Sequence, residues 1–272
     1  MAVTMADIQK LRNVTGAGMM DCKSALNEAG GDIEAAKQIL RKKGQAVAAK
    51  REDREAAEGC VLAATSGDFA AIVALKCETD FVAKNEEFIA LTQQILDAAI
   101  AHKPETIEAL LALKLNTGTI AELITDRSGV TGEKMELGYY EHLTSPCVAK
   151  YIHPGNRLAT IVAFNKEAGE NVQKDVAMQV AAMNPVAVSK EGVSQEIIDT
   201  EFKIAREKAQ EAGKPENLLD KIAEGALTKF FKENTLLQQE YIKDSKLTIE
   251  QFLKQNDKDL TVTAFKRVSL SV

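Results

Sequence analysis

At 272 residues the chain is long enough to bury one large hydrophobic core or two smaller ones. Hydrophobic residues make up 45% and charged residues 27%, as in ordinary water-soluble globular proteins. The formal net charge of −6 disfavours a direct nucleic-acid partner, because phosphate binding depends largely on Lys and Arg. The N-terminus lacks a signal-peptide pattern, and no run approaches the roughly 18 apolar residues that cross a bilayer. We therefore expect a cytoplasmic protein without a membrane partner.

The four cysteines are scattered along the chain and form no C-x-x-C pair: Cys22, Cys60, Cys77 and Cys147. In a chain of this length they do not make a disulfide framework, which indicates a reducing compartment.

Residues 1–45 are predicted to form three short helices. Thr4 can cap the first helix, and Asp32 can cap the third after the break at "GGD". Apolar residues at helical spacing mark one face of the first helix: Met5, Ile8 and Leu11. Because a unit this small has few large apolar residues, it is marginally stable alone and is interpreted as a surface-binding module.

Residues 46–58 are alanine-rich and alternately charged, and we interpret them as a linker that is partly helical. A basic cluster begins just before the linker and continues into it: Arg41, Lys42, Lys43, Lys50 and Arg51. A solvated helix face explains such a cluster better than a phosphate site, although the phosphate site stays open.

A repeated unit follows, which divides the rest of the chain into residues 59–145 and 146–272. "CVLAATSGDFAAIVALKCE" (60–78) and "CVAKYIHPGNRLATIVAFNKE" (147–167) each place two apolar, β-rich runs around a turn, which predicts a hairpin. An amphipathic helix follows each hairpin, and the second strands correspond, "AAIVALKCE" against "ATIVAFNKE". Two related hairpin-plus-helix subdomains with antiparallel pairing, an α+β fold, are expected.

The remaining elements complete these subdomains. "EKMELGYYEHLTS" (133–145) is predicted as a strand of the first sheet and "LTVTAFKRVSLSV" (260–272) as a strand of the second. "GTIAELITDRSGV" (118–130) and "TIEQFLKQN" are predicted as helices. The helix after the second hairpin is expected to turn one apolar stripe inward: Val172, Val176, Val180 and Met183.

Residues of about 194–233 show the alternating spacings of four and three that are typical of a coiled-coil seam, with "GKP" between two helices. Two antiparallel helices of this length make a hairpin of about 25 Å. A protruding contact arm and a helix pair docked on the core both fit this pattern.

Sequence motifs for catalysis are missing. There is no phosphate-binding loop, nucleophile elbow or H-E-x-x-H motif, and the three histidines, His102, His142 and His153, have no metal-ligand spacing. We therefore predict no catalytic residue, no metal and no cofactor, and a protein that acts by binding and is not an enzyme. A site assembled in space between the subdomains is the enzymatic alternative.

The stretch "TDFVAKNEEF" (79–88) stands at the corner between a predicted strand and a helix. Thr79 or Asp80 can cap the helix, and Phe81 either folds back on its own subdomain or projects as an anchor for a partner. The second repeat has "AGEN" (168–171) at the same corner and no aromatic residue. A phenylalanine required for folding should recur there, so the asymmetry favours a binding role.

Together, "LRNVTGAGMMDCKSALNEAGGDIEAA" (11–36) and "TDFVAKNEEF" closely resemble the bacterial translation elongation factor Ts family, the nucleotide-exchange factors for elongation factor Tu. The resemblance runs nearly end to end and includes "YIHPGNRLATIV" (151–162), "VAMQVAAMNP" (176–185), "AGKPENLLDKIAEG" (212–225) and "VTAFKRV" (262–268).

The resemblance implies a ubiquitin-associated-like N-terminal module that docks on the GTPase domain of Tu. The matching contact positions there are Arg12, Met19, Met20 and Lys23. It also implies that the 194–233 hairpin is a protruding coiled coil and that His153 is a further contact. The chain stops at Val272, without the extra C-terminal helical module of some relatives, so a smaller contact with Tu is expected.

The resemblance further implies that one corner enters the GTPase domain near its Mg²⁺ site: Thr79, Asp80, Phe81 and Val82. We hypothesise that Phe81 acts as a wedge that displaces Mg²⁺ and releases GDP. GDP-bound and nucleotide-free Tu would both be partners, and a 2:2 assembly with Tu is left open. The alternative is a passive adaptor or chaperone that binds Tu without promoting exchange.

Overall fold

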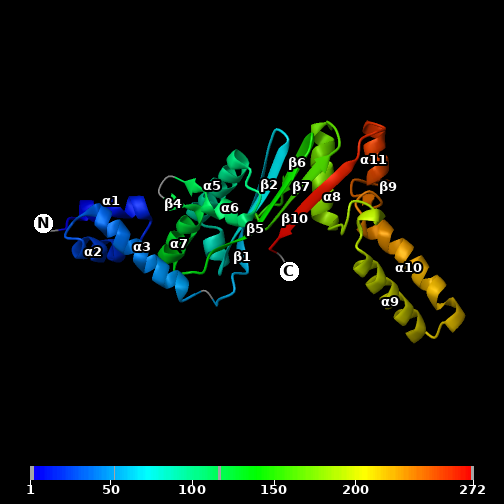
Figure 1. Ribbon diagram of the computed structural model, residues 1–272, viewed down its shortest axis with the longest axis horizontal. Coiled ribbons are helices and arrows are strands. Elements are labelled where there is room, and N and C mark those ends of the chain that lie inside the picture. The colour runs from blue at the N-terminus through cyan, green and yellow to red at the C-terminus, as the bar shows by residue number, and fades with distance from the viewer. Residues whose placement is uncertain (1–2, 52, 116–117, 271–272) are drawn as a thin grey trace.

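Two three-stranded antiparallel sheets lie at the centre of an elongated molecule (Figure 1). The computed structural model describes residues 3–51, 53–115 and 118–270. The first sheet has the order β1-β2-β5 and the second β10-β7-β6. Their strands are β1 Glu58–Ser66, β2 Phe69–Cys77, β5 Glu136–Thr144, β6 Cys147–Ile152, β7 Leu158–Phe164 and β10 Val262–Ser269. The expected α+β class and the strands that complete each sheet are confirmed.

The predicted segments reach beyond the described residues at several points. Residues 1–2 of the N-terminal module, 52 of the linker, 116–117 of the first subdomain and 271–272 of the last strand lie outside the described residues.

The sheets pack against each other through small and branched side chains. Alternate residues of each strand point inward, where Ala63 and Ile72 of the first sheet meet Ala159 and Ile161 of the second. The opposite faces are covered by helices, with Phe88 at the centre of one outer cluster and Phe164 in the other. The centre is therefore four layers deep, in the order helix, sheet, sheet, helix.

The first sheet is covered by α5 (Glu86–His102), α6 (Ile107–Ala112) and α7 (Ile120–Thr131), while β3 (Lys114–Leu115) and β4 (Gly118–Thr119) form a two-residue ladder. Thr119 begins α7 with a capping box that includes Glu122, and Gly132 ends it with a left-handed φ of 72°. These caps fix where α7 starts and stops, which matters because both of its ends contact other elements.

The second sheet is covered by α8 (Glu170–Met183) and α11 (Ile249–Asn256), with β8 (Glu240–Tyr241) and β9 (Asp244–Thr248) beside them. Val172, Val176 and Val180 are buried as expected. Met183 is 44% exposed, so its predicted inward position is wrong. It is the last residue of the helix, directly before Asn184, whose left-handed conformation ends α8.

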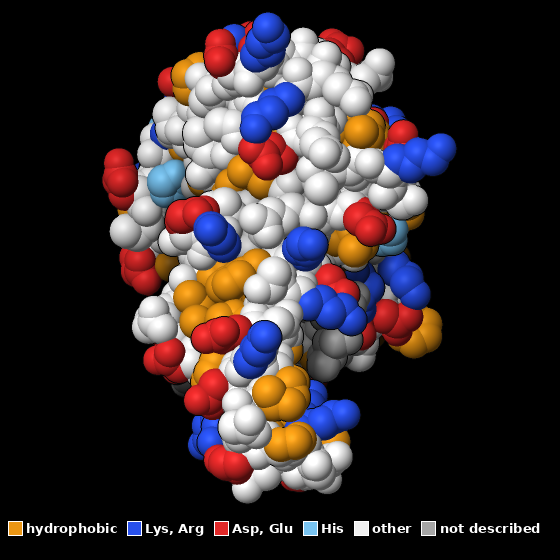
Figure 2. Space-filling model, turned by 90° about the vertical axis from the view of Figure 1, so that its right-hand side faces the viewer, with side chains coloured by type: hydrophobic (Ala, Val, Ile, Leu, Met, Phe, Trp, Pro, Cys, Tyr) orange, Lys and Arg blue, Asp and Glu red, His pale blue; other side chains and the backbone are white. Residues whose placement is uncertain are grey.

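A pair of helices, α9 (Gln195–Glu211) and α10 (Leu219–Asn234), projects from one end of the molecule (Figure 1). Ala209, Leu219 and Ala223 are buried between them. Other apolar residues line an open groove of about 320 Å³ on the pair: Ile204, Ala205, Ile222, Ala226, Leu227 and Phe230. Figure 2 looks at this end of the molecule and shows hydrophobic side chains among charged ones on its lower, projecting part.

The N-terminal helices α1 (Met5–Thr15), α2 (Met19–Glu28) and α3 (Ile33–Ala49) form a small unit at the other end of the molecule (Figure 1). Leu11, Cys22 and Leu26 are fully buried in its core, and Val130 of α7 packs against that core from outside. Of the residues predicted to share one face of α1, Ile8 and Leu11 are buried, whereas Met5 is 66% exposed. Helix α3 continues to Ala49, four residues into the segment that was expected to be a linker.

None of the helices in the described part of the chain combines the length and the apolar character needed to cross a membrane.

Candidate partner-binding surface

The most exposed large apolar side chain among the described residues is Phe81, at 85%. It lies in α4 (Asp80–Ala83), a single helical turn between β2 and α5. Val82 and Ala83 pack against the cluster under the first sheet, so Phe81 is turned away from that cluster. The prediction that this ring projects outward is therefore supported, and the alternative that it folds back is excluded.

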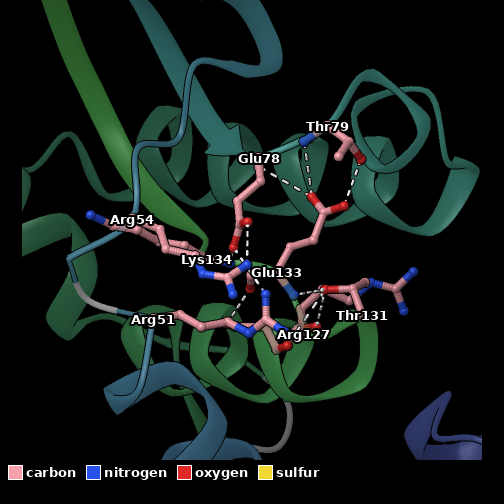
Figure 3. A network of polar contacts seen from close by, with 9 residues as sticks. Arg51, Arg54, Glu78, Thr79, Arg127, Thr131, Glu133 and Lys134 are labelled. Carbon is pink, nitrogen blue, oxygen red and sulfur yellow. Dashed lines mark hydrogen bonds and ion pairs between the residues drawn. The ribbon is translucent and has the colours of Figure 1, made fainter.

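The corner is held by a carboxylate from a distant part of the chain. Glu133, just after α7, accepts hydrogen bonds from the Thr79 backbone N–H at 3.0 Å and the Glu78 N–H at 3.1 Å (Figure 3). Its other oxygen accepts the Thr79 hydroxyl at 2.5 Å. The Thr79 hydroxyl oxygen in turn accepts the N–H of Val82 and caps α4.

Glu78 provides a second brace immediately before the corner. Its carboxylate accepts the Lys134 backbone N–H at 2.6 Å, and it pairs with Arg54 at 3.0 Å and Arg51 at 3.3 Å (Figure 3). The Lys134 N–H, with Arg54 and Arg51, holds the pKa of Glu78 below its ordinary value. The two arginines follow α3, so the segment that leaves the N-terminal unit is tied to the base of the Phe81 corner.

Asp80 lies on the solvent side of the corner. Its carboxylate accepts a hydrogen bond from the Lys84 ammonium at 2.6 Å, and this contact lowers the pKa of Asp80. The sequence left open whether Thr79 or Asp80 caps the helix, and the Thr79 side chain does so. Because Glu133 supplies the carboxylate that holds Thr79, bracing the corner does not require Asp80.

The predicted contact residues of the N-terminal unit differ in exposure. Arg12, Met20 and Lys23 are exposed, with Met20 at 75%, whereas Met19 is partly buried against the core of the unit. Val14 is a further exposed apolar residue that the sequence did not single out. This unit thus offers flexible apolar side chains beside basic ones.

The structure brings Arg12 close to the segment that follows the corner. Arg12 lines a polar cleft of about 760 Å³ between α1 and the start of α5, together with Asn85, Glu86 and Glu87. Asn85 caps α5 directly after α4. A predicted contact residue of the N-terminal unit and the residues that follow the Phe81 corner, distant in sequence, therefore border one cleft.

His153 lies in the β6–β7 turn, is exposed, and makes a hydrogen bond between its Nδ1 and the Tyr151 hydroxyl at 3.1 Å. The same turn reaches the first sheet, where Arg157 forms an ion pair with Glu58. Glu58 is also the strand partner of Cys77, which precedes the corner. The turn that carries His153 and the α4 corner that carries Phe81 therefore lie at the same end of the first sheet.

The surface presents an exposed aromatic ring, exposed methionines and charged side chains. Across residues 3–51, 53–115 and 118–270, no group of three His, Cys, Asp or Glu side chains is arranged to hold a metal ion. An exposed aromatic ring on a braced corner and an exposed methionine on the N-terminal unit are typical of protein-binding surfaces.

Comparison with known proteins agrees with this class and narrows it. The sequence profile of the family described as Elongation factor TS matches residues 78–271. The chain is 66% identical over 272 residues to Elongation factor Ts of Porphyromonas gingivalis, covering 100% of this chain and 99% of that protein. It is 54% identical over 273 residues to Elongation factor Ts of Azobacteroides pseudotrichonymphae, covering both chains fully. The chain belongs to the elongation factor Ts family.

Proposed function

We propose that this chain is a guanine-nucleotide exchange factor for elongation factor Tu and that Phe81 is the residue that inserts into the GTPase domain of Tu. Membership of the elongation factor Ts family supports the activity and the partner, and also a place in the cytoplasm, where translation occurs. The observation that carries the residue assignment is the 85% exposure of Phe81 on a corner braced by Glu133.

A braced corner is an effective way to present one aromatic ring. A buried aromatic anchor at an interface contributes about 2 kcal/mol or more, but immobilising a mobile segment on binding offsets part of that gain. Here the hydrogen bonds from Thr79 to Glu133 fix the turn before any partner arrives. The ring of Phe81 can therefore insert between helices of the GTPase domain with little further loss of conformational entropy in the corner.

Exchange follows from this wedge by thermodynamic coupling. A protein that binds nucleotide-free Tu more tightly than GDP-bound Tu must weaken the binding of GDP to Tu. The weakening is reciprocal, because GDP lowers the affinity of Tu for the exchange protein by the same ratio. Mg²⁺ requires near-ideal octahedral coordination, so a shift of about 1 Å in its ligands expels it. GDP then loses its counter-ion and leaves, and GTP displaces the factor. No covalent bond is made or broken, so the proposed protein is not an enzyme.

Other parts of the chain have supporting roles in this proposal. Residues 1–45 act as a ubiquitin-associated-like module that docks on the GTPase domain through Met20 and its neighbours. Residues 59–145 and 146–272 are the two core subdomains, and the helix pair within 194–233 is a coiled-coil arm. A 2:2 assembly with Tu is compatible with this arrangement.

Release of fluorescent GDP from purified Tu tests the proposal. The wild-type chain should accelerate release, and Phe81→Ala should slow the accelerated rate at least about thirtyfold, the equivalent of about 2 kcal/mol. Met183→Ala is the matched control, because Met183 is another exposed apolar residue but lies at the end of α8, outside the predicted contact surfaces. Phe81→Ala should fold like the wild type, since its ring makes no core contact.

Two results would contradict the proposal. If Phe81→Ala exchanges at the same rate as Met183→Ala and the wild type, the wedge is wrong. If the wild-type chain binds Tu but leaves the GDP off-rate unchanged, the chain is the passive adaptor or chaperone instead.

A further inference from the structure

Two glycines inside helices meet where the N-terminal unit contacts the core. Gly44 lies within α3 and Gly129 within α7. A methyl group added at Gly129 would lie 2.2 Å from the Gly44 Cα, and one added at Gly44 would lie 3.3 Å from the Gly129 Cα. Glycine inside a helix costs about 1 kcal/mol relative to alanine. Their position at a backbone-to-backbone crossing supplies a physical reason for that cost.

Side chains on both sides of the crossing strengthen the contact. Arg41 of α3 pairs with Glu122 at 2.7 Å and lies 3.6 Å from Asp126, both on α7. On the other side, Val130 of α7 packs against the hydrophobic core of the N-terminal unit. The second half of α3 is therefore docked along α7 through backbone contact, ion pairs and apolar packing.

The same helix α7 also positions the Phe81 corner. Its Ser128 hydroxyl donates a hydrogen bond of 2.5 Å to the backbone carbonyl of Glu133, whose carboxylate holds Thr79. The residue before it, Arg127, donates to the side chain of Asn85 at 3.0 Å and pairs with Glu87. The beginning of α5, directly after the corner, is therefore also fixed to α7.

We propose that α7 joins the N-terminal unit and the Phe81 corner into one rigid body, and that the Gly44–Gly129 crossing is the joint. The two surfaces then reach the partner at a fixed spacing, with Gly44 and Gly129 as positioning residues that touch no partner themselves. The consequence for exchange rests on the proposed function, whereas the rigidity is a property of the free chain.

A fixed spacing matters because two linked contacts bind cooperatively only when their geometry allows both to engage. A rigid connection of the right length gives the second contact a high effective concentration, and a loose connection lowers it. Loosening the joint should therefore weaken productive binding while leaving the Phe81 corner able to act once it is in place.

The rigidity is tested on the free chain by distance measurement between spin labels at Glu28→Cys in α2 and Gln94→Cys in α5, both exposed positions. The native cysteines are buried, so labelling is directed to the introduced ones. We expect a narrow distance distribution in this parent. Gly129→Ala, whose methyl cannot fit, should broaden or shift it. Gly44→Ala should do so less, and Gly225→Ala, with no atom within 4 Å, should leave it unchanged.

A second variant separates the joint from the chain connection. Four Gly/Ser residues inserted between Arg54 and Glu55 lengthen the connection to β1 but leave α3 and α7 untouched. If the joint holds the unit, the insertion leaves the distance distribution narrow. If the insertion broadens the distribution as much as Gly129→Ala does, the connection holds the unit and the inference is overturned.

Exchange kinetics give a readout that a general loss of structure would not mimic. We expect Gly129→Ala to raise the half-saturating concentration in GDP release by about tenfold or more, with the maximal rate changed less than about twofold. A loss in the maximal rate as large as the rise in the half-saturating concentration would overturn the inference. If circular dichroism shows that Gly129→Ala does not fold, three other measurements decide the outcome. These are the distance distributions of the doubly labelled parent, of Gly44→Ala and of the insertion variant.

The outcomes keep the two proposals apart. A broad distribution in the parent overturns the rigid joint, whatever Phe81→Ala does to exchange. A narrow distribution that Gly129→Ala broadens supports the joint even if Phe81→Ala exchanges normally, in which case only the proposed function fails.

Discussion

The Glu133 carboxylate accepts hydrogen bonds from both polar groups of Thr79, the backbone N–H at 3.0 Å and the hydroxyl at 2.5 Å. Because the hydroxyl has a single proton and gives it to Glu133, its lone pairs are left to accept the N–H of Val82. One acidic side chain thus sets both the entry of the chain into α4 and the cap of that helix.

Replacing Glu133 should impair exchange without touching the partner-facing surface. Glu133→Ala removes three acceptor contacts, so we expect the corner to lose order and stability to fall by about 1–2 kcal/mol. Glu133→Gln keeps one acceptor oxygen and should retain more activity. GDP release from Tu and urea unfolding measure the two effects, with Glu167→Ala, an exposed position between β7 and α8, as control. A Glu133→Ala variant that exchanges as fast as Glu167→Ala would show that the brace is dispensable.

Local patterns were enough to predict most elements of the fold. The apolar runs on either side of Ser-Gly-Asp and Pro-Gly-Asn predicted both hairpins, because strand period and turn chemistry are properties of neighbouring residues. The exposed Phe81 was also predicted, from its place at a capped corner and the missing aromatic in the second repeat.

The parts that could not be predicted depend on contacts between distant residues. Glu133 lies 54 residues after Thr79, and no local pattern pairs them. The Gly44–Gly129 crossing depends on the tertiary placement of two helices and has no periodic signal. Met183 was misplaced for a related reason, because burial at a helix end depends on what packs across from it.

The brace at Glu78 should weaken in acid. Its pKa is lowered chiefly by the Lys134 N–H and also by Arg54 and Arg51. The folded pKa is therefore below the ordinary value of 4.5, so the contribution to stability is present above pH 4.5 and is lost as pH falls through the folded pKa. We expect the stability difference between wild type and Glu78→Gln to shrink below that pH.

Urea unfolding of both proteins from pH 7 to pH 3 measures this difference, and a carboxyl NMR titration of Glu78 locates the folded pKa. A difference that stays constant across this range would mean that the ionised Glu78 contributes nothing through Lys134, Arg54 and Arg51.

The thiols should be unreactive in the folded protein. All four cysteines are buried, and burial raises the pKa of Cys77 to about 12 and that of Cys60 to about 11. The folded pKa values exceed the unfolded value of 9.0, so the protonated thiols contribute fully to the stability of the fold below pH 9. This contribution is lost as pH rises above 9 through the folded pKa values. A disulfide thiol reagent at pH 8 should react slowly with native protein and rapidly after denaturation. Fast reaction of the native chain would contradict this burial.

Met20 and Phe81 should affect different kinetic parameters, since one is expected to dock the N-terminal unit and the other to act on the nucleotide site. Met20→Ala removes an exposed side chain that makes no core contact, so folding should be unchanged. We expect its half-saturating concentration for GDP release from Tu to rise about tenfold, the equivalent of about 1.4 kcal/mol, with the maximal rate preserved. Met183→Ala, exposed at the far end of α8, is the control. If Met20→Ala lowers the maximal rate and leaves the half-saturating concentration unchanged, Met20 acts on the nucleotide site and the division of roles between the two surfaces is wrong.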